Sequence, residues 1–263
     1  MLKFSANLSM LFTEVPLIER FQAAKDQGFA AVEMQFPYSL SATAIKQALD
    51  KTGLKLVLFN VDADDLLQGG EGLACVPEKR EQFKQAVAQA ATYAELLQPE
   101  VINVLPGRCL QQDRLNEYLD TFQQNLNFAA QAFAPLAVKT VFEAINSRDM
   151  PGFIINTGPQ MLDVLNQQNN PKLLMQYDIY HAQMMSDNPA EFILQNADKI
   201  GHIQFADCPG RGQPGTGRID FVEVFSAIEK APYSGWVGAE YKPIGGTVNS
   251  LSWLLSQLNK AND

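Results

Sequence analysis

Residues 2–28, LKFSANLSMLFTEVPLIERFQAAKDQG, show the unit from which the chain is built. Residues 2–8 have the apolar composition of a buried strand, and residues 16–27 have the spacing of an amphipathic helix that ends before Gly28. The connection at 9–13 contains no glycine, whereas a dinucleotide-binding open sheet places a glycine-rich turn after its first strand. The first unit therefore favours a closed barrel over a doubly wound sheet.

The same alternation of strand and helix continues along the chain. The predicted strands are 2–8, 31–35, 54–59, 101–105, 140–144, 173–178, 202–206 and 236–240. The predicted helices are 16–27, 41–51, 77–97, 110–133, 159–167, 189–196, 221–229 and 248–259. Eight units in 263 residues give about 33 residues each, which is typical of a (β/α)8 TIM barrel. No linker or repeat divides the chain, so we predict an α/β fold with one barrel domain over residues 1–263.

Composition and charge restrict the possible partners. A hydrophobic share of 46% is enough for a full core, which excludes a disordered or low-complexity chain. The net charge is −9 and no basic stripe offsets it, so we predict no nucleic-acid partner. No apolar run approaches the ~18 residues of a membrane span, so we predict no membrane partner. The oligomeric state stays open, and a homo-oligomer is compatible with the sequence.

The cysteines indicate the compartment. Cys75, Cys109 and Cys208 are far apart and form no CxxC pair. An odd, sparse set of this kind favours reduced thiols over a disulfide scaffold or a zinc–thiolate site. The first ten residues also lack the apolar core of a signal peptide. We therefore expect a cytoplasmic protein.

Polar residues end most of the predicted strands, where a barrel of this type places its active site. Those at the ends of the fifth to eighth strands are Glu143, Asp178, Gln204 and Glu240. Neighbouring strands lie about 4.8 Å apart, so three carboxylates at one height would repel one another without a cation. An all-oxygen set suits Mg²⁺ or Mn²⁺ as the cofactor. The alternative is that each residue is separately hydrogen-bonded to a nearby loop or helix N-terminus.

Other polar residues are candidates for substrate binding. Asn7 and Glu33 end the first two strands, His181 follows the proposed ligand Asp178 by three residues, and Lys242 follows Glu240 by two. His202 faces the same way as Gln204 but one layer deeper, which predicts an interior residue and not a ligand.

Two glycine-rich segments follow predicted strands. Segment 209–218, PGRGQPGTGR, lacks the Lys-Ser/Thr ending of a phosphate-binding loop, and we interpret it as a flexible active-site loop that presents Arg211 and Arg218. Segment 68–72, QGGEG, is compatible with a lid or with a plain loop.

An ordered set of motifs resembles the hydroxypyruvate isomerases, within the xylose-isomerase-like TIM barrels. The matching motifs are NLSM at 7–10, FTE at 12–14, VE at 32–33, FPY at 36–38, FEA at 142–144, DIYH at 178–181, HIQ at 202–204 and GAEYKP at 238–243. Three departures bear on substrate choice. Asn103 stands where the family usually has histidine, Arg218 stands where it usually has glutamate, and the segment around Glu71 lacks a bulky or basic residue.

The resemblance implies an enzyme, an aldose–ketose type isomerase (an intramolecular oxidoreductase) that interconverts hydroxypyruvate and tartronate semialdehyde. It implies a metal held by Glu143, Asp178, Gln204 and Glu240, with Glu143 and Glu240 as the acid/base pair, and a place in glyoxylate and carbohydrate metabolism. Enediolate chemistry of this kind needs two bases positioned on the substrate and no covalent nucleophile.

Several rivals remain at this stage. An isomerase of a longer oxo-acid such as 2-oxo-tetronate, or a ketose 3-epimerase, would use the same site. A repair nuclease on a related barrel would need several metal-binding histidines and a basic groove, whereas the chain has 2 histidines. A non-catalytic sugar-acid-binding protein would have no reason to keep all four ligands.

Overall fold

Eight parallel strands close into a barrel in sequence order, β1 to β8, and β8 pairs with β1. The structure is a computed structural model that describes residues 2–168 and 170–259. The strands are β1 (Lys3–Asn7), β2 (Ala31–Met34), β3 (Lys55–Asn60), β4 (Val101–Asn103), β5 (Lys139–Glu143), β6 (Leu173–Asp178), β7 (Ile200–Phe205) and β8 (Trp236–Ala239). The (β/α)8 TIM barrel fold predicted from the sequence is confirmed. The predicted domain limits at 1 and 263 fall on residues outside the described ranges.

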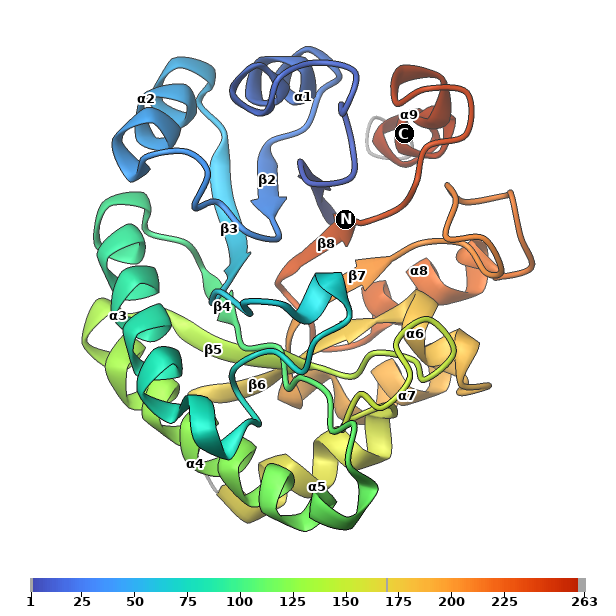
Figure 1. The fold of residues 1–263 in the computed structure, drawn as a ribbon. Helices are drawn as coiled ribbons and strands as arrows, with labels where there is room; N and C mark the ends of the chain where they lie inside the picture. The colour runs from blue at the N-terminus through green and yellow to red at the C-terminus, as the bar shows by residue number, and fades with distance from the viewer. Residues whose placement is uncertain (1, 169, 260–263) are drawn as a thin grey trace.

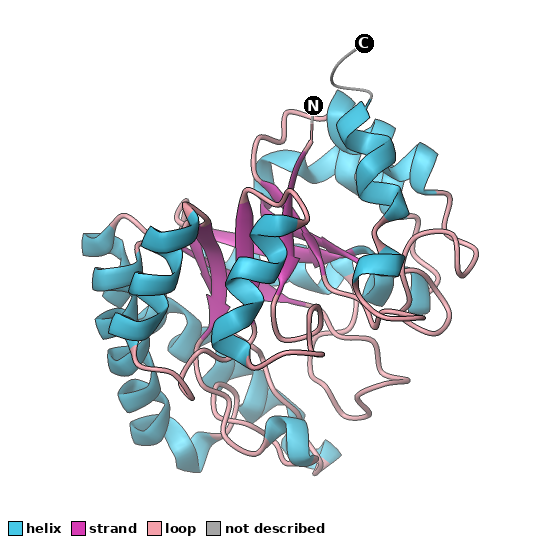
Figure 2. Cartoon of the chain, turned by 90° about the horizontal axis from the view of Figure 1, so that it is seen from above, coloured by secondary structure: helices cyan, strands magenta, loops and turns pink. Residues whose placement is uncertain are grey.

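Helices surround the strands on the outside of the barrel (Figure 1), and Figure 2 shows the strands enclosed by them in a second direction. They are α1 (Arg20–Asp26), α2 (Ala42–Thr52), α3 (Arg80–Leu97), α4 (Leu115–Phe133), α5 (Gly158–Gln168), α6 (Ile179–Met184), α7 (Pro189–Asn196), α8 (Phe221–Lys230) and α9 (Ser252–Asn259). No helix in the described ranges has both the length and the apolar character needed to cross a membrane.

Local sequence explains where many helices begin and end. The Ser41 side chain accepts a hydrogen bond from the Ala44 amide at the start of α2, and Gly53 ends that helix at φ +68°. Four helices begin later than the sequence predicts, each after a short 3₁₀ turn: α1 at Arg20 instead of 16, α3 at Arg80 instead of 77, α4 at Leu115 instead of 110 and α9 at Ser252 instead of 248. The short helix α6 was not predicted. Helix α6 forms because the Asp178 carboxylate caps it by accepting from the Tyr180 amide.

The interior of the barrel changes from apolar to polar along the strands. Ala31, Val101 and Val141 belong to an apolar cluster inside the barrel. Two residues further along each strand, on the same face, come Glu33, Asn103 and Glu143, all buried. The apolar layer therefore seals the amino-terminal end of the barrel, and the polar side chains gather at the carboxyl-terminal end.

Candidate active site

A cavity of about 590 Å³ opens at the carboxyl-terminal end of the barrel. Both glutamates of the predicted acid/base pair line it, Glu143 at the end of β5 and Glu240 just after β8, and so do the predicted substrate-binding residues His181, Arg211 and Lys242. Gln35, Asn60, Asp149 and Tyr180 complete the polar part of the wall, and Phe36, Leu67, Leu105, Ile145, Met150 and Met184 form its apolar part. The wall of the cavity is therefore about half polar and half apolar.

Glu143 and Asp178 are both buried, and together with His181 they form a compact group of potential metal ligands. One potential ligand atom from each of the three lies within 4.8 Å of the other two. Asp178 Oδ2 is buried without a hydrogen-bond partner among the described residues. It lies 3.6 Å from His181 Nε2 and 3.7 Å from a guanidinium nitrogen of Arg211. An acidic, buried and unpartnered oxygen of this kind fits a divalent cation.

The charge balance of these carboxyls is unfavourable without a cation. Burial, together with the charges of Glu240 and Asp178, raises the pKa of Glu143 well above its usual value. Burial also raises the pKa of Asp178, to about 7, although Arg211 acts in the opposite direction. Protons therefore compete with a cation for this site at neutral pH.

We expect Mn²⁺ affinity to rise with pH up to about pH 8, by roughly tenfold per unit for each proton released. The raised pKa values of Glu143 and Asp178 mean that both carboxyls hold protons in the range where ordinary carboxyls are ionised. Calorimetric titrations of the metal-free protein between about pH 5.5 and pH 8 would measure this dependence. An Asp178→Asn variant should show a flatter profile, and a pH-independent affinity in the wild type would contradict the expectation.

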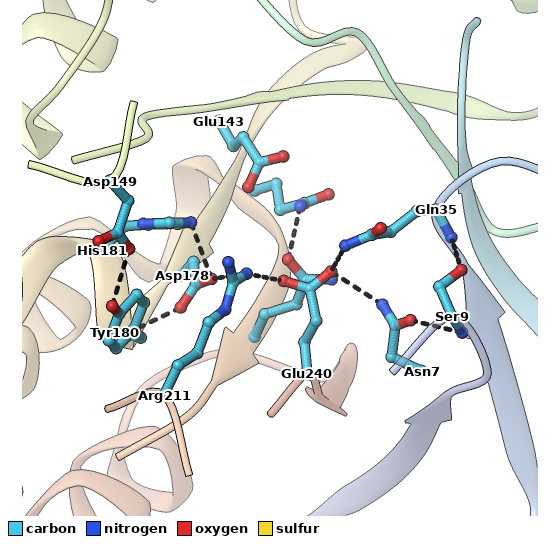
Figure 3. A network of polar contacts seen from close by, with 12 residues as sticks. Asn7, Ser9, Gln35, Glu143, Asp149, Asp178, Tyr180, His181, Arg211 and Glu240 are labelled. Atoms are coloured by element: carbon cyan, nitrogen blue, oxygen red, sulfur yellow. Dashed lines mark hydrogen bonds and ion pairs between the residues drawn. The ribbon is translucent and has the colours of Figure 1, made fainter. Parts of the chain in front are cut away.

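The other two predicted ligands are engaged elsewhere. Glu240 accepts hydrogen bonds from Arg211 at 2.6 Å on Oε2, and from Asn7 at 2.9 Å and Gln35 at 3.0 Å on Oε1 (Figure 3). Gln204 donates to Glu33 and its carbonyl oxygen accepts from Gln176 at 2.6 Å. The predicted quartet is thus brought to one end of the barrel, but only Glu143 and Asp178 belong to the compact cluster of three.

His181 has a defined orientation. Its Nδ1 atom lies 2.7 Å from the side-chain nitrogen of Asn146, whose carbonyl oxygen accepts from the amides of Arg148 and Asp149. Because the Asn146 nitrogen must donate, Nδ1 accepts and the ring carries its proton on Nε2. Burial, with the positive charge of Arg211, lowers the pKa of His181 well below its usual value. The ring is therefore neutral and offers an N–H donor beside the cavity, so in this tautomer the two carboxyls, and not His181, are the groups available to a cation.

Two predicted substrate contacts do not lie on the cavity wall. Asn7 and Glu33 are both 0% exposed, and the structure places them among internal hydrogen bonds beneath the cavity. Glu33 is too deep to line the cavity. It comes two residues before Gln35, which lies on the same face one layer higher and does line the cavity. His202 lies 2.8 Å from Glu33, so its predicted interior position is confirmed.

Arg211 lies on a loop that is held by hydrogen bonds, and the flexibility of 209–218 stays a prediction. Asp207 accepts hydrogen bonds from four backbone amides of the loop, at 2.8 to 3.1 Å, those of Cys208, Gly215, Gly217 and Ile219. These four bonds support the backbone of Arg211 in the left-handed region, at φ +56°. The Arg211 side chain then passes over the Tyr180 ring and reaches Glu240. Arg218 is exposed and does not line the cavity.

The loops after β7 and β8 are joined to each other. The Lys242 amide donates to the Arg211 carbonyl at 2.7 Å, and the Gln213 side chain accepts from the Ile244 amide at 3.0 Å. The segment at 68–72 is also tied down, since Arg108 donates to the Gly69 carbonyl at 2.7 Å. In this structure 68–72 is thus an anchored loop.

Replacing Asp207 with alanine should lower the free energy of unfolding by about 3 kcal/mol, because it leaves several loop amides without their acceptor. Turnover should fall as well, because the loop that positions Arg211 loses the bonds that hold it. Urea denaturation would measure the first effect. Asp220→Ala is the matched control, because Asp220 caps the exposed start of α8 with two similar bonds, and about 1 kcal/mol is expected there. Equal losses in the two variants would contradict the role given to Asp207.

Sequence reasoning missed several residues of this site. Gln35 donates to Glu240 at 3.0 Å, and Asn103 donates to Glu143 at 2.9 Å. Tyr180 donates to Asp149 at 2.7 Å on the opposite wall (Figure 3). The period of two along a strand could have found Gln35 from Glu33. No comparable signal marks Asp149, which lies on a loop.

The barrel and its polar cavity suit an enzyme, and comparison with known proteins gives the family. The chain belongs to the family described as "Xylose isomerase-like TIM barrel", whose model matches residues 21–257. It is 40% identical to hydroxypyruvate isomerase of Escherichia coli over 97% of this chain and 98% of that protein. It is 36% identical to 2-oxo-tetronate isomerase of Pectobacterium atrosepticum over 98% of both chains. The predicted family and isomerase class are confirmed.

Solved structures agree on the fold. A crystal structure from Brucella melitensis, described as an AP endonuclease of family 2, has a TM-score of 0.93 and 34% identity, covering 97% of this chain and 99% of that one. The 3-keto-D-glucoside 4-epimerase of Escherichia coli has a TM-score of 0.80 at 21% identity, covering 97% of this chain and 99% of that chain, and shows the fold alone.

Proposed function

We propose that this protein interconverts hydroxypyruvate and tartronate semialdehyde, with a divalent cation and two glutamates. The observation that supports this most strongly is that Glu143 and Glu240, from β5 and β8, line one small cavity together with Arg211 and Lys242. Two carboxylates on a substrate-sized chamber suit proton transfer between neighbouring carbons, and the two basic side chains suit an anionic substrate. The relatives named hydroxypyruvate isomerase and 2-oxo-tetronate isomerase are consistent with a small oxo-acid.

The residues of the site would divide the work as follows. One glutamate would take a proton from the hydroxyl-bearing carbon, the other would give a proton to the adjacent carbon, and the hydroxyl proton would pass to the former carbonyl oxygen. His181 donates from Nε2 to a substrate oxygen, and Lys242 attracts the substrate carboxylate. Arg211, which donates to Glu240, would fix the orientation of that base. Glu143, Asp178, Gln204 and Glu240 would hold Mg²⁺ or Mn²⁺. The ion, when bound, supplies stabilisation of negative charge on the substrate oxygens.

A direct assay tests the substrate. Purified protein with Mg²⁺ or Mn²⁺ is incubated with hydroxypyruvate, 2-oxo-tetronate or free ketoses, and products are followed by NMR. We expect hydroxypyruvate to give tartronate semialdehyde with the highest kcat/KM. A higher kcat/KM for 2-oxo-tetronate would assign the longer acid, as the relative from Pectobacterium atrosepticum suggests. Turnover of none of these compounds would contradict the proposal.

Nuclease activity is a second candidate only because the similar Brucella melitensis protein is called an AP endonuclease. The excess of 29 acidic over 20 basic residues is unfavourable for binding a phosphate backbone. Incubation with DNA that contains abasic sites should leave the DNA uncut.

A further inference from the structure

A second polar cluster lies beneath the cavity, centred on the carboxylate of Glu33 at the end of β2. One oxygen, Oε2, lies 2.8 Å from both Ser5 Oγ and His202 Nε2. The other, Oε1, accepts from the side-chain nitrogens of Gln204 at 2.7 Å and Asn7 at 3.1 Å. A carboxylate with four partners and no exposed surface has one defined position.

Strand β8, which lies on the other side of β1 from β2, leaves room for this carboxylate. A Cβ atom at Gly238 of β8 would lie 2.3 Å from Glu33 Oε2 and 2.5 Å from Oε1. Gly238 precedes Glu240 by two residues and faces the same way, so the missing side chain is at the level just below the predicted base. The space that β8 leaves at this level is filled by Glu33.

An ionised carboxylate only accepts hydrogen bonds, so it determines which way a neighbouring amide points. Gln204 must turn its nitrogen toward Glu33, which turns its carbonyl oxygen away, toward β6, where Gln176 donates to it. Asn7 likewise turns its nitrogen between Glu33 and Glu240, while its own oxygen accepts from the Ser9 amide at 3.0 Å.

The side chains of Ser5, Asn7 and Gln204 all donate to this carboxylate, so both of its oxygens act as acceptors. Glu33 therefore directs the nitrogens of both amides from below. Without that carboxylate, each amide loses one of the hydrogen bonds that fix its direction.

We propose that Glu33 is a positioning residue for the cation site. It turns the carbonyl oxygen of Gln204 toward β6, the strand that carries Asp178, and, through Asn7, it fixes the carboxylate of Glu240. It does not itself touch substrate or metal. This role rests on the proposed function, because it takes Gln204 and Glu240 to be ligands.

The test is Mn²⁺ binding to the metal-free full-length protein, followed by electron paramagnetic resonance of the free ion. Glu33→Met should bind Mn²⁺ about 10- to 100-fold more weakly, the usual effect of losing a residue that orients a ligand. Glu33→Gln should lose less, because its carbonyl oxygen can still accept from Gln204. Gly238→Ala should also bind more weakly, since the added Cβ displaces a carboxylate that is still present.

Ser5→Ala is the matched control, because it removes a donor from Oε2 and leaves both amides on Oε1. Its Mn²⁺ affinity should stay close to that of the wild type. Circular dichroism and cooperative urea unfolding show which variants fold. If Glu33→Met does not fold, Gly238→Ala tests the proposal in its place.

Wild-type affinity in the folded Glu33→Met or Gly238→Ala variant would overturn the proposal, and so would equal losses in Ser5→Ala and Glu33→Met. Failure of the wild type itself to bind Mn²⁺ would instead overturn the proposed function, and this inference with it.

Discussion

Replacing Glu143 with glutamine is expected to lower kcat for the isomerisation by about 10²- to 10⁴-fold, and Glu240→Gln should have a similar effect. Glutamine keeps the shape of the side chain and an oxygen for a cation, but it cannot take up or release a proton at neutral pH. Both side chains line the cavity, and each is only 5% exposed. A carboxylate on the protein surface therefore cannot take the place of either one. A coupled assay under saturating substrate would measure the loss.

The controls separate lost chemistry from lost metal. Each variant is titrated with Mn²⁺, and only metal-loaded protein is assayed. Glu95→Gln, at an exposed position on α3, should leave kcat unchanged. Turnover near the wild-type rate in either loaded variant would show that the paired-base mechanism is wrong.

Removing the divalent cation should abolish turnover, and adding Mg²⁺ or Mn²⁺ should restore it. The buried carboxyls of Glu143 and Asp178 have raised pKa values, so the metal-free site holds protons where the reaction needs ionised groups. The same treatment should lower Tm, because an ion that binds only the folded chain stabilises it. Activity and thermal unfolding are measured before and after chelation, with metal content checked by elemental analysis.

Chelator that has been saturated with Mg²⁺ beforehand is the matched control, and it should affect neither activity nor Tm. Full turnover in protein shown to contain no metal would contradict a cation-dependent mechanism. It would also leave the unpartnered oxygen of Asp178 without a function.

The sequence predicted the barrel because strand composition, helix spacing and unit length all indicate the same fold. It also predicted that Glu143 and Glu240 would meet at the carboxyl ends, since the period of two along a strand determines which face a residue occupies. The height of each polar side chain above the apolar layer of the barrel was less predictable. The register shifts between Val32 and Glu33, and again between Met175 and Gln176, and such local irregularities change the level of a side chain relative to its neighbours.

Loop-borne contacts could not be predicted for a different reason. Arg211 reaches Glu240 only because the buried Asp207 gathers backbone amides that are spread over 12 residues. Neither the charge of Arg211 nor its distance along the chain from Glu240 indicates that contact. The orientation of Gln204 is likewise a property of several strands together and not of β7 alone.

The bonds between the β7 and β8 loops limit how the specificity of this enzyme can be altered. Arg211 and Lys242 stand on two loops that share main-chain and side-chain bonds, so neither can be shifted without disturbing the other. If one loop alone were replaced by that of a relative with another substrate, its hydrogen bonds to the other loop would be lost. Engineering toward longer acids should therefore transplant residues 207–219 and 240–246 as a pair.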